Sequence, residues 1–156
     1  KELESSEEGG PLGIKGTEGL VVSYARCCHP IPGDPIIGHV SAGRGIVIHT
    51  DTCRNMVELR NKPEEIMGVR WEPNVAQEFS VELRVQLEHQ RGIIAVVAST
   101  VTEANANIER INMVEKDAHL GIVNMVINVQ DRIHLANVIK RLRTIKAISR
   151  IVRVRN

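Results

Sequence analysis

The sequence predicts an α+β protein made of two modules, a small one that contains the cysteines and a longer one with a regular order of strands and helices. Between 79 and 156 the apolar residues follow strand and helix periods in the order β-α-β-β-α-β. The first half instead shows short strands around three cysteines. A Pro-Asn pair at 73–74 separates the two patterns. We place an acidic linker at 1–13, the cysteine-containing module at 14–75 and the second module at 76–156.

The second module begins with the clearest pattern in the chain. From 79 to 87 apolar and polar residues alternate without fault, which predicts a strand with one buried face. Residues 93–104 place apolar side chains on one helical stripe, and Asp131 is expected to cap a second helix whose apolar positions run to 145. Further strands are expected at 108–115, 122–130 and 148–154, with a turn at 117–121. This order predicts the ferredoxin-like split βαβ arrangement, one antiparallel sheet with two helices on a single face.

The first module has weaker signals. Short strands are expected at 19–25, 36–41 and 44–49, the last two joined by a hairpin turn at 41–43. A short helix is expected at about 52–60, capped by Thr50 or Asp51, with Pro63 soon after its end. A closing strand is expected at 68–72.

Composition limits the classes of function. Aromatic residues make up 2% of the chain, one each of Phe, Tyr and Trp, so a base-stacking surface for nucleic acid would be nearly bare. No apolar run is long enough to span a bilayer, and the acidic Gly/Ser-rich start resembles neither a signal nor a transit peptide. Three cysteines are an odd number, whereas a secreted disulfide framework normally has an even one. We expect a reduced, cytoplasmic compartment and a larger parent protein.

Charge is uneven along the chain although the formal net charge is only +1. Residues 1–20 carry five acids against two bases, a balance of −3, and residues 131–156 carry eight bases against one acid, a balance of +7. The basic end suggests an anionic partner, or else a solvated helix face and strand edge. The bases that would contact such a partner are Lys140, Arg141, Arg143, Lys146, Arg153 and Arg155.

The stretch ARCCHPIPGD, 25–34, places two cysteines side by side before a stiff turn. His49 and Cys53 follow with the spacing H-x-x-x-C across a strand-to-helix junction, where an imidazole and a thiolate can share an ion. Cys27 and Cys28 would complete a tetrahedral site if the backbone turns sharply there, as the nearby prolines and glycine allow. His29 and His39 are rival nitrogen donors.

Two other interpretations of the cysteines stay open at this point. Free cysteines are among the most buried residue types, so all three could simply be small core residues. A catalytic thiol, Cys28 beside His29, is a third interpretation, although neighbours on an extended segment point apart and the orienting group and oxyanion donors of such a site are not evident.

The segment EGLVVSYARCCHPIPGDPIIGHVSAGRGIVIHTDTC, 18–53, resembles the C-terminal region of the RelA/SpoT stringent-response enzymes, long proteins that make and hydrolyse (p)ppGpp. The resemblance extends over nearly the whole chain from about residue 14. His29 resembles the SpoT-like, hydrolase-competent branch, because the synthetase-only branch tends to carry Gln there. In that family the first module is described as a zinc-finger or conserved-cysteine domain. The resemblance thus implies a structural zinc ion on Cys27, Cys28, His49 and Cys53.

The second module resembles the ACT (or RRM-like) domain of the same family. ACT domains typically bind small effectors, often amino acids, at a Gly-containing turn after the first strand. The acidic residue common in that turn is absent here, where His89 or Gln90 stands instead. The residues expected to form an effector site are His89, Gln90, Arg91, Gly92, Ile93, Asn105 and Asn107; alternatively the glycine serves only close packing at a helix start.

The resemblance as a whole implies a non-catalytic regulatory region of a bifunctional (p)ppGpp hydrolase/synthetase. Nothing in the chain resembles the His/Asp hydrolase site or the nucleotide site of the synthetase, which we expect upstream. The expected partners are the upstream catalytic domains of the same chain, a second copy bound through the ACT domain, an amino-acid effector, and a regulatory protein or ribosomal RNA; no membrane is expected. The alternative is a ribosome- or RNA-binding module that acts through its basic surface.

Overall fold

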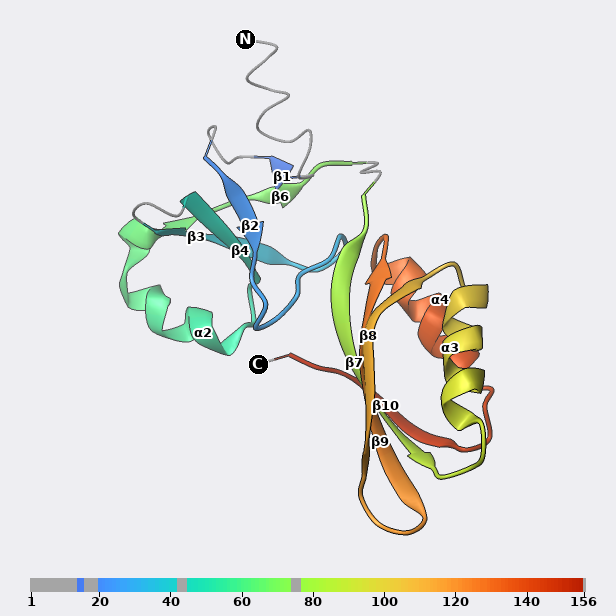
Figure 1. Cartoon of the computed structure of the whole chain (residues 1–156). Helices are drawn as coiled ribbons and strands as arrows, with labels where there is room; N and C mark the ends of the chain where they lie inside the picture. Colours follow the sequence, from blue (N-terminus) through green and yellow to red (C-terminus); the bar gives the residue numbers. More distant parts are fainter. Residues whose placement is uncertain (1–13, 16–19, 42–44, 74–76, 156) are drawn as a thin grey trace. The chain divides into compact units, whose positions relative to one another are not determined.

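The computed structural model describes residues 14–15, 20–41, 45–73 and 77–155, which form two compact units (Figure 1). The first unit reaches Gln77 and the second spans Glu78–Val154, and each is described by itself. The expected linker at 1–13, the tip of the hairpin at 42–43 and the predicted strand starts at 19 and 44 lie outside the described residues.

The first unit is built on a four-stranded sheet in the order β2-β4-β3-β5. Its strands are β2 (Val22–Tyr24), β3 (Ile36–Ser41), β4 (Gly45–Thr50) and β5 (Ile66–Met67). β2 runs parallel to β4, and β3 is antiparallel to both β4 and β5. A separate pair joins β1 (Ile14–Lys15) to β6 (Arg70–Trp71). Trp71 stacks on Tyr24 with ring centroids 6.0 Å apart and donates its indole N–H to the Asp34 carbonyl at 3.0 Å.

The predicted helix at 52–60 is wrong in its length and in its cap. α2 (Arg54–Val57) has only four residues, and two 3-10 turns, η1 (Glu58–Asn61) and η2 (Pro63–Glu65), follow it. Its N-cap position is Cys53, without a side-chain cap bond. Cys53 N donates to Thr50 O at 3.1 Å, so Thr50 and Asp51 belong to the preceding turn instead of the helix start.

The predicted strand at 68–72 is confirmed only at Arg70 and Trp71, which form β6, and it is shorter than expected. Ile66 and Met67 pair with β3, whereas Arg70 and Trp71 pair with β1, so the chain leaves one sheet and enters another within a few residues. Such two-residue strands are too short to show a period of two in the sequence.

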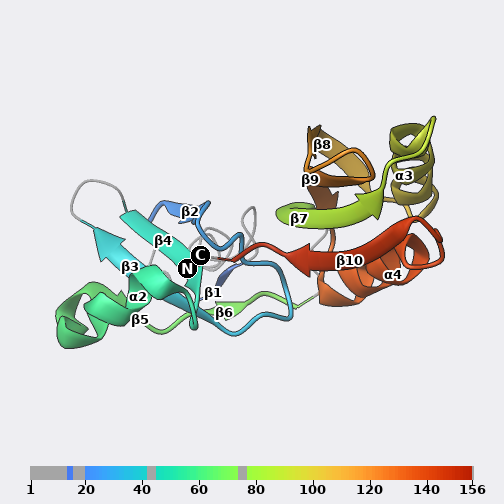
Figure 2. The same cartoon turned by 90° about the horizontal axis from the view of Figure 1, so that it is seen from below.

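The second unit confirms the predicted order of strands and helices and, with it, the α+β class. Its elements are β7 (Phe79–Glu88), α3 (Ile93–Glu103), β8 (Asn107–Glu115), β9 (Leu120–Val129), α4 (Arg132–Leu142) and β10 (Ile148–Arg153). All neighbours in the sheet order β10-β7-β9-β8 are antiparallel. Both helices cover the same face of this sheet (Figures 1 and 2).

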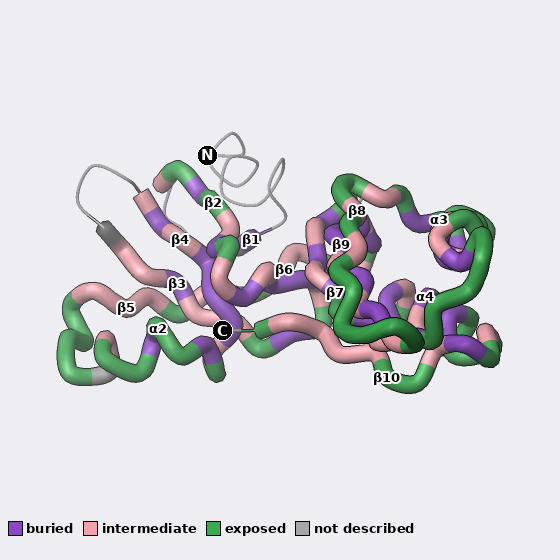
Figure 3. The backbone as a smooth tube through the Cα atoms, turned by 60° about the horizontal axis from the view of Figure 1, so that its bottom comes forward, coloured by how far each residue is buried: buried purple, intermediate pink, exposed green. Residues whose placement is uncertain are grey.

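Burial alternates strictly along β7, and β9 follows the same alternation except at Val126, which is also buried (Figure 3). On β7 the residues Val81, Leu83 and Val85 have no exposed surface, and their neighbours point to the uncovered face. The helices complete the core with the buried residues Ile93, Val97, Val101, Leu135, Val138 and Leu142. The predicted cap of the second helix is confirmed, because Asp131 accepts the backbone N–H of His134 at 2.8 Å.

Candidate metal centre

The backbone at the cysteine pair is irregular, as a site using adjacent ligands requires. Ala25 N extends the β2–β4 pairing to Ile48 O, and the chain then reverses in a turn closed by His29 N and Ala25 O at 3.0 Å. His29 has a φ of 44°, a left-handed conformation that is uncommon for a residue other than glycine. The turn therefore directs both cysteine side chains into the same space.

Asp34 fixes the loop that follows the cysteines. Its carboxylate accepts the N–H of Ile31 at 2.9 Å, and its own N–H donates to Ile31 O at 2.9 Å. Asp34 and Ile31 are buried. This local hydrogen bonding explains the Pro-Gly-Asp sequence of the loop without a direct role in metal binding.

His49 and Cys53 come to the same point from the end of β4 and the start of α2. The turn between them, closed by Cys53 N and Thr50 O, brings the two side chains to one side. Thr50 also donates its N–H to Cys28 Sγ at 3.4 Å. A hydrogen bond to sulfur of this kind favours the charged thiolate, which is the form that binds metals.

The four side chains fit a tetrahedral ion of the size of Zn²⁺. Bonds of about 2.3 Å to sulfur and about 2.0 Å to nitrogen would place the ligand atoms about 3.5–3.8 Å apart. Cys27 Sγ lies 3.5 Å from Cys53 Sγ and 4.0 Å from Cys28 Sγ. His49 Nδ1 lies 3.5 Å from Cys27 Sγ and 3.8 Å from Cys28 Sγ. All four ligand atoms lie within 4.8 Å of one another, so this cluster could hold a metal ion.

Burial sets the protonation of these groups. It raises the pKa of Cys28 to about 12 and also raises the pKa of Cys53. Burial, together with the nearby His39, lowers the pKa of His49. The imidazole is therefore neutral at physiological pH, as a metal ligand must be. A cation at this point would replace the thiol protons and compensate the buried negative charge.

Neither rival histidine belongs to this group of four side chains. His39 contacts Glu65 through Nε2 at 3.1 Å, and its ring centroid is 6.5 Å from that of His49. His29 is not among the grouped metal-binding side chains of the described residues. Cys28 has no exposed surface, which leaves no access for a substrate to a catalytic thiol.

The core interpretation of the cysteines is compatible with the metal site. Cys28 and Cys53 are buried with Ala25 and Met56, and apolar residues from several elements surround them. The same side chains therefore contribute apolar packing on the outside of the cluster and donor atoms on its inside.

The residues expected to bind an effector are divided between the two ends of α3. His89, Gln90, Arg91 and Gly92 form the turn before the helix, and Asn105 and Asn107 follow its other end. Eleven helical residues, about 16 Å, separate the two groups, so a small ligand cannot contact both. Asn105, with a φ of 64°, is the left-handed residue that ends α3, where its N–H donates to Thr102 O at 3.0 Å.

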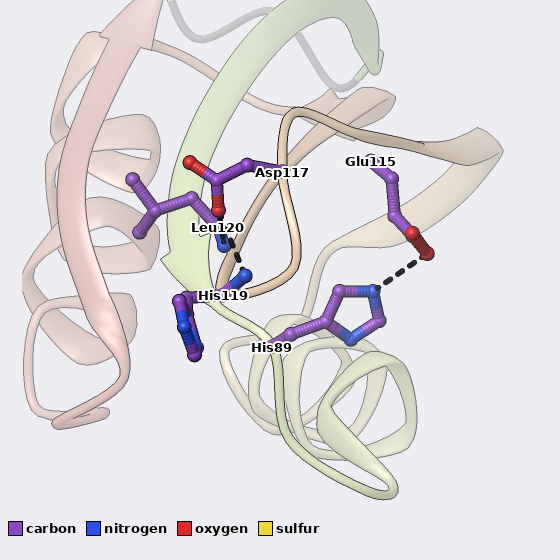
Figure 4. Close-up of polar contacts among 5 residues, drawn as sticks. All are labelled: His89, Glu115, Asp117, His119 and Leu120. Carbon is purple, nitrogen blue, oxygen red and sulfur yellow. Dashed lines mark hydrogen bonds and ion pairs between the residues drawn. The ribbon is translucent and has the colours of Figure 1, made fainter.

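The turn before α3 instead contacts the β8–β9 hairpin (Figure 4). His89 N donates to His119 O at 2.7 Å, and His89 Nε2 lies 3.6 Å from a carboxylate oxygen of Glu115. Gly92, with a φ of 76°, starts α3. These contacts attach the expected effector turn to the hairpin tip.

The basic C-terminal residues lie on several different elements. Lys140 and Arg141 lie in the last turn of α4, where Arg141 donates to Glu103 O at 3.3 Å. They line a hollow of about 440 Å³ between the ends of the two helices. Arg153 instead ends β10, an edge strand of the sheet. Exposed Arg143 and Lys146 lie in the connection after α4, and Arg155 follows β10.

The sequence analysis missed a polar hollow on the uncovered face of the sheet. It has a volume of about 260 Å³, and Glu82, Arg84, Arg110, Asn112 and Asn124 contribute its polar lining. The alternation along β7, β8 and β9 placed these residues on the solvent side, but only the strand order brings Arg110 of β8 near Arg84 of β7.

Comparisons with known proteins agree with this architecture. Residues 12–72 match the model of the RelA/SpoT RIS domain, and residues 76–153 match the model of an ACT domain. The bifunctional (p)ppGpp synthase/hydrolase SpoT of Escherichia coli (strain K12) is 38% identical over 152 residues, 97% of this chain and 22% of that protein. The GTP pyrophosphokinase of Streptomyces coelicolor is 30% identical over 141 residues, 90% of this chain and 17% of that protein.

Among solved structures, the solution NMR structure of the ACT domain from the GTP pyrophosphokinase of Chlorobium tepidum is similar. It has 22% sequence identity and a TM-score of 0.45, and the match covers 51% of this chain and 89% of that one.

The fold and the matched domains define an ACT-domain protein with a preceding cysteine-containing domain. The chain belongs to the RelA/SpoT family and corresponds to its C-terminal regulatory region. It spans about a fifth of the length of the curated relatives that it matches. None of the described helices combines the length and apolar character that crossing a membrane requires.

Proposed function

We propose that this chain regulates a bifunctional enzyme that makes and hydrolyses (p)ppGpp, by sensing a ligand or partner and relaying that signal to catalytic domains of the same protein in the cytoplasm. The observation that carries the proposal is the presence of a RIS domain followed by an ACT domain. In addition, 97% of the chain aligns with a relative named as a (p)ppGpp synthase/hydrolase. A regulator of this kind changes rates only if it favours one conformation of the catalytic domains over another.

Deletion of residues 14–156 from the full-length protein tests this function. We expect the ratio of synthesis to hydrolysis to shift while both activities stay measurable. Loss of both activities in a truncated protein that is still folded would contradict the proposal, as would hydrolysis of (p)ppGpp by the isolated chain.

We further propose that the metal held by Cys27, Cys28, His49 and Cys53 is zinc. The support is the donor set of three sulfurs and one imidazole nitrogen, with spacings that suit a closed tetrahedral site. Such an ion joins the turn after β2 to the end of β4 and the start of α2, and its binding contributes directly to the folding of the first unit.

The ACT unit is the proposed site of both effector binding and self-association. Its uncovered sheet face carries half-buried Ile122 and Val152 and exposed Val114, and β8 is a nine-residue edge strand. A second copy would bury these groups. Light scattering on the purified chain should show a dimer, and a monomer at every accessible concentration would overturn this part of the proposal.

Titration with amino acids and with RNA separates the two classes of ligand. An amino acid held in the ACT unit should bind with little dependence on salt, whereas RNA held through phosphates must dissociate steeply as salt rises. The division of the basic residues between α4 and β10 favours the effector over RNA.

A further inference from the structure

Two of the four metal-binding side chains are also arranged to react with each other. Cys27 Sγ lies 3.5 Å from Cys53 Sγ, the shortest sulfur–sulfur distance given by the cluster, and all three cysteines are reduced in this structure. The two residues are 26 positions apart and lie on different elements, the turn after β2 and the start of α2. A bond between them would therefore cross-link the same two segments that the metal joins.

Exposure to solvent differs among the three cysteine residues. Cys27 is partly exposed, whereas Cys28 has no exposed surface and Cys53 only 2%. Cys27 is therefore the cysteine that a small oxidant from solution meets first. Oxidation of a cysteine follows its thiolate character and its access to solvent, and a metal ligand is a thiolate.

Cys53 is the favoured partner of an oxidised Cys27. Adjacent residues have Cα atoms about 3.8 Å apart across a trans peptide, which is below the 4.4–6.8 Å span of ordinary disulfides. A bond between Cys27 and Cys28 would thus be strained. Cys28 is in addition held by the N–H of Thr50 at 3.4 Å. Cys53 has no such sequence constraint relative to Cys27.

We propose that Cys27 is an oxidation site for hydroperoxides. Its oxidation produces a Cys27–Cys53 disulfide and releases the metal ion from the protein. The Cys27 sulfur attacks one peroxide oxygen, the O–O bond breaks, and water or an alcohol leaves after taking a proton, so that Cys27 becomes a sulfenic acid. The Cys53 thiolate then attacks the Cys27 sulfur, the S–S bond forms, and the S–O bond breaks with loss of water after a second proton is taken. The two thiolates lose two electrons and the peroxide gains them.

The consequence for the metal follows from the number of ligands. With two of four donors converted to a disulfide, Cys28 and His49 remain, and two donors do not form a closed tetrahedral site. The disulfide keeps the turn after β2 attached to the start of α2, so we expect the first unit to stay folded after release. This consequence rests on the proposed zinc site, whereas the pairing rests on the sulfur geometry alone.

The test uses the reduced, zinc-loaded chain and hydrogen peroxide in small molar excess. Zinc is measured before and after treatment with a colorimetric chelator, and free thiols are then alkylated. Trypsin cleaves after Arg26, Arg44 and Arg54, which leaves Cys27 and Cys28 in peptide 27–44 and Cys53 in peptide 45–54. Tandem mass spectrometry of the linked peptides shows which cysteine carries the alkyl group. We expect release of roughly one zinc ion per chain and an alkylated Cys28.

Variants separate the pairing from the loss of metal. Cys28→Ser should still give the linked peptides with peroxide, whereas Cys53→Ser should give none and should accumulate the sulfenic or sulfinic acid at Cys27. Addition of a thiol reductant and zinc should restore the zinc content of the wild type. A chain that never held zinc contradicts the metal site. A zinc-loaded chain that gives a Cys27–Cys28 or Cys28–Cys53 bond, or no disulfide, contradicts the oxidation site.

Discussion

The Nδ1 atom of His49 lies 3.5 Å from the Sγ atom of Cys27, whereas the neighbouring His39 contacts the carboxylate of Glu65. The two histidines are on adjacent antiparallel strands with ring centroids 6.5 Å apart. Only one of them is therefore placed to donate a lone pair to an ion among the thiols.

This difference predicts opposite results for two matched substitutions. His49→Gln removes the nitrogen ligand, so we expect zinc content to fall from about one ion per chain to a small fraction and the melting temperature of the first unit to fall with it. His39→Gln should keep both. Elemental analysis gives the zinc content, and fluorescence of Trp71, the single tryptophan, reports melting of the first unit. Equal loss of zinc in both variants would remove the assignment of His49.

Two glycines of the first unit allow a similar comparison. Gly45 has a φ of 77°, and a Cβ there would collide with the backbone carbonyl of Val21, whereas a Cβ on Gly68 meets nothing within 4 Å. We expect Gly45→Ala to destabilise the first unit by about 1–3 kcal/mol. Gly68→Ala should change the stability of that unit by less than about 0.5 kcal/mol. Denaturant unfolding followed by Trp71 fluorescence measures both. Similar midpoints for the two variants would contradict the left-handed turn at Gly45.

The pKa of Asp117 gives a pH-dependent prediction for the β8–β9 hairpin. Its carboxylate accepts the N–H groups of His119 at 2.7 Å and Leu120 at 2.8 Å, and these bonds lower its pKa (Figure 4). A lowered folded-state pKa means that the stabilisation is complete above the unfolded pKa of about 3.9 and disappears as the pH falls through the folded value. We expect the difference in unfolding midpoint between wild type and Asp117→Ala to be largest at neutral pH and to shrink below about pH 4.

Far-UV circular dichroism is the suitable probe for this unit, which has neither Trp nor Tyr. Asp117→Asn keeps an oxygen acceptor without the charge, so its difference from Asp117→Ala should not depend on pH. A wild-type advantage over Asp117→Ala that stays constant down to pH 3 would show that the charge of Asp117 does not matter.

The sequence predicted the second unit well because one face of each long strand is buried. The alternation from Phe79 to Leu87 records directly which side chains meet the helices, and the spacing of Val97 and Val101 does the same for α3. Less of the first unit could be predicted, because β5 and β6 have two residues each and their pairing depends on distant strands.

The same distinction holds for the sites. The spacing of His49 and Cys53 grouped them correctly because a single turn joins them, and the sharp turn expected near the prolines brings Cys27 and Cys28 to the same point. The expected effector residues failed to come together because α3 lies between them, which their chemical types alone do not show. The hollow at Arg84 and Arg110 depends on the strand order and has no local signal.

The start of α4 provides a last test of local hydrogen bonding. Asp131 is extended, and its side chain accepts the N–H of His134 at 2.8 Å, one of the donors that a helix start otherwise leaves unpaired. The Nδ1 atom of His134 accepts the backbone N–H of Gln130 at 3.0 Å. The proton of this ring is therefore on Nε2, which donates to Ala104 O at 2.8 Å. The cap therefore fixes both the helix and a contact with the end of α3.

We expect Asp131→Ala to destabilise the second unit by about 1 kcal/mol, because the alanine offers no acceptor to the first turn. For a unit of this size that loss corresponds to a melting temperature lower by about 4–8 °C. Asp131→Ser is the matched control, since serine caps helices about as well and should restore most of the loss. Circular dichroism of the three proteins measures the difference. If the alanine and serine variants melted at the same temperature, the hydrogen bond from His134 to Asp131 would not be what stabilises the start of α4.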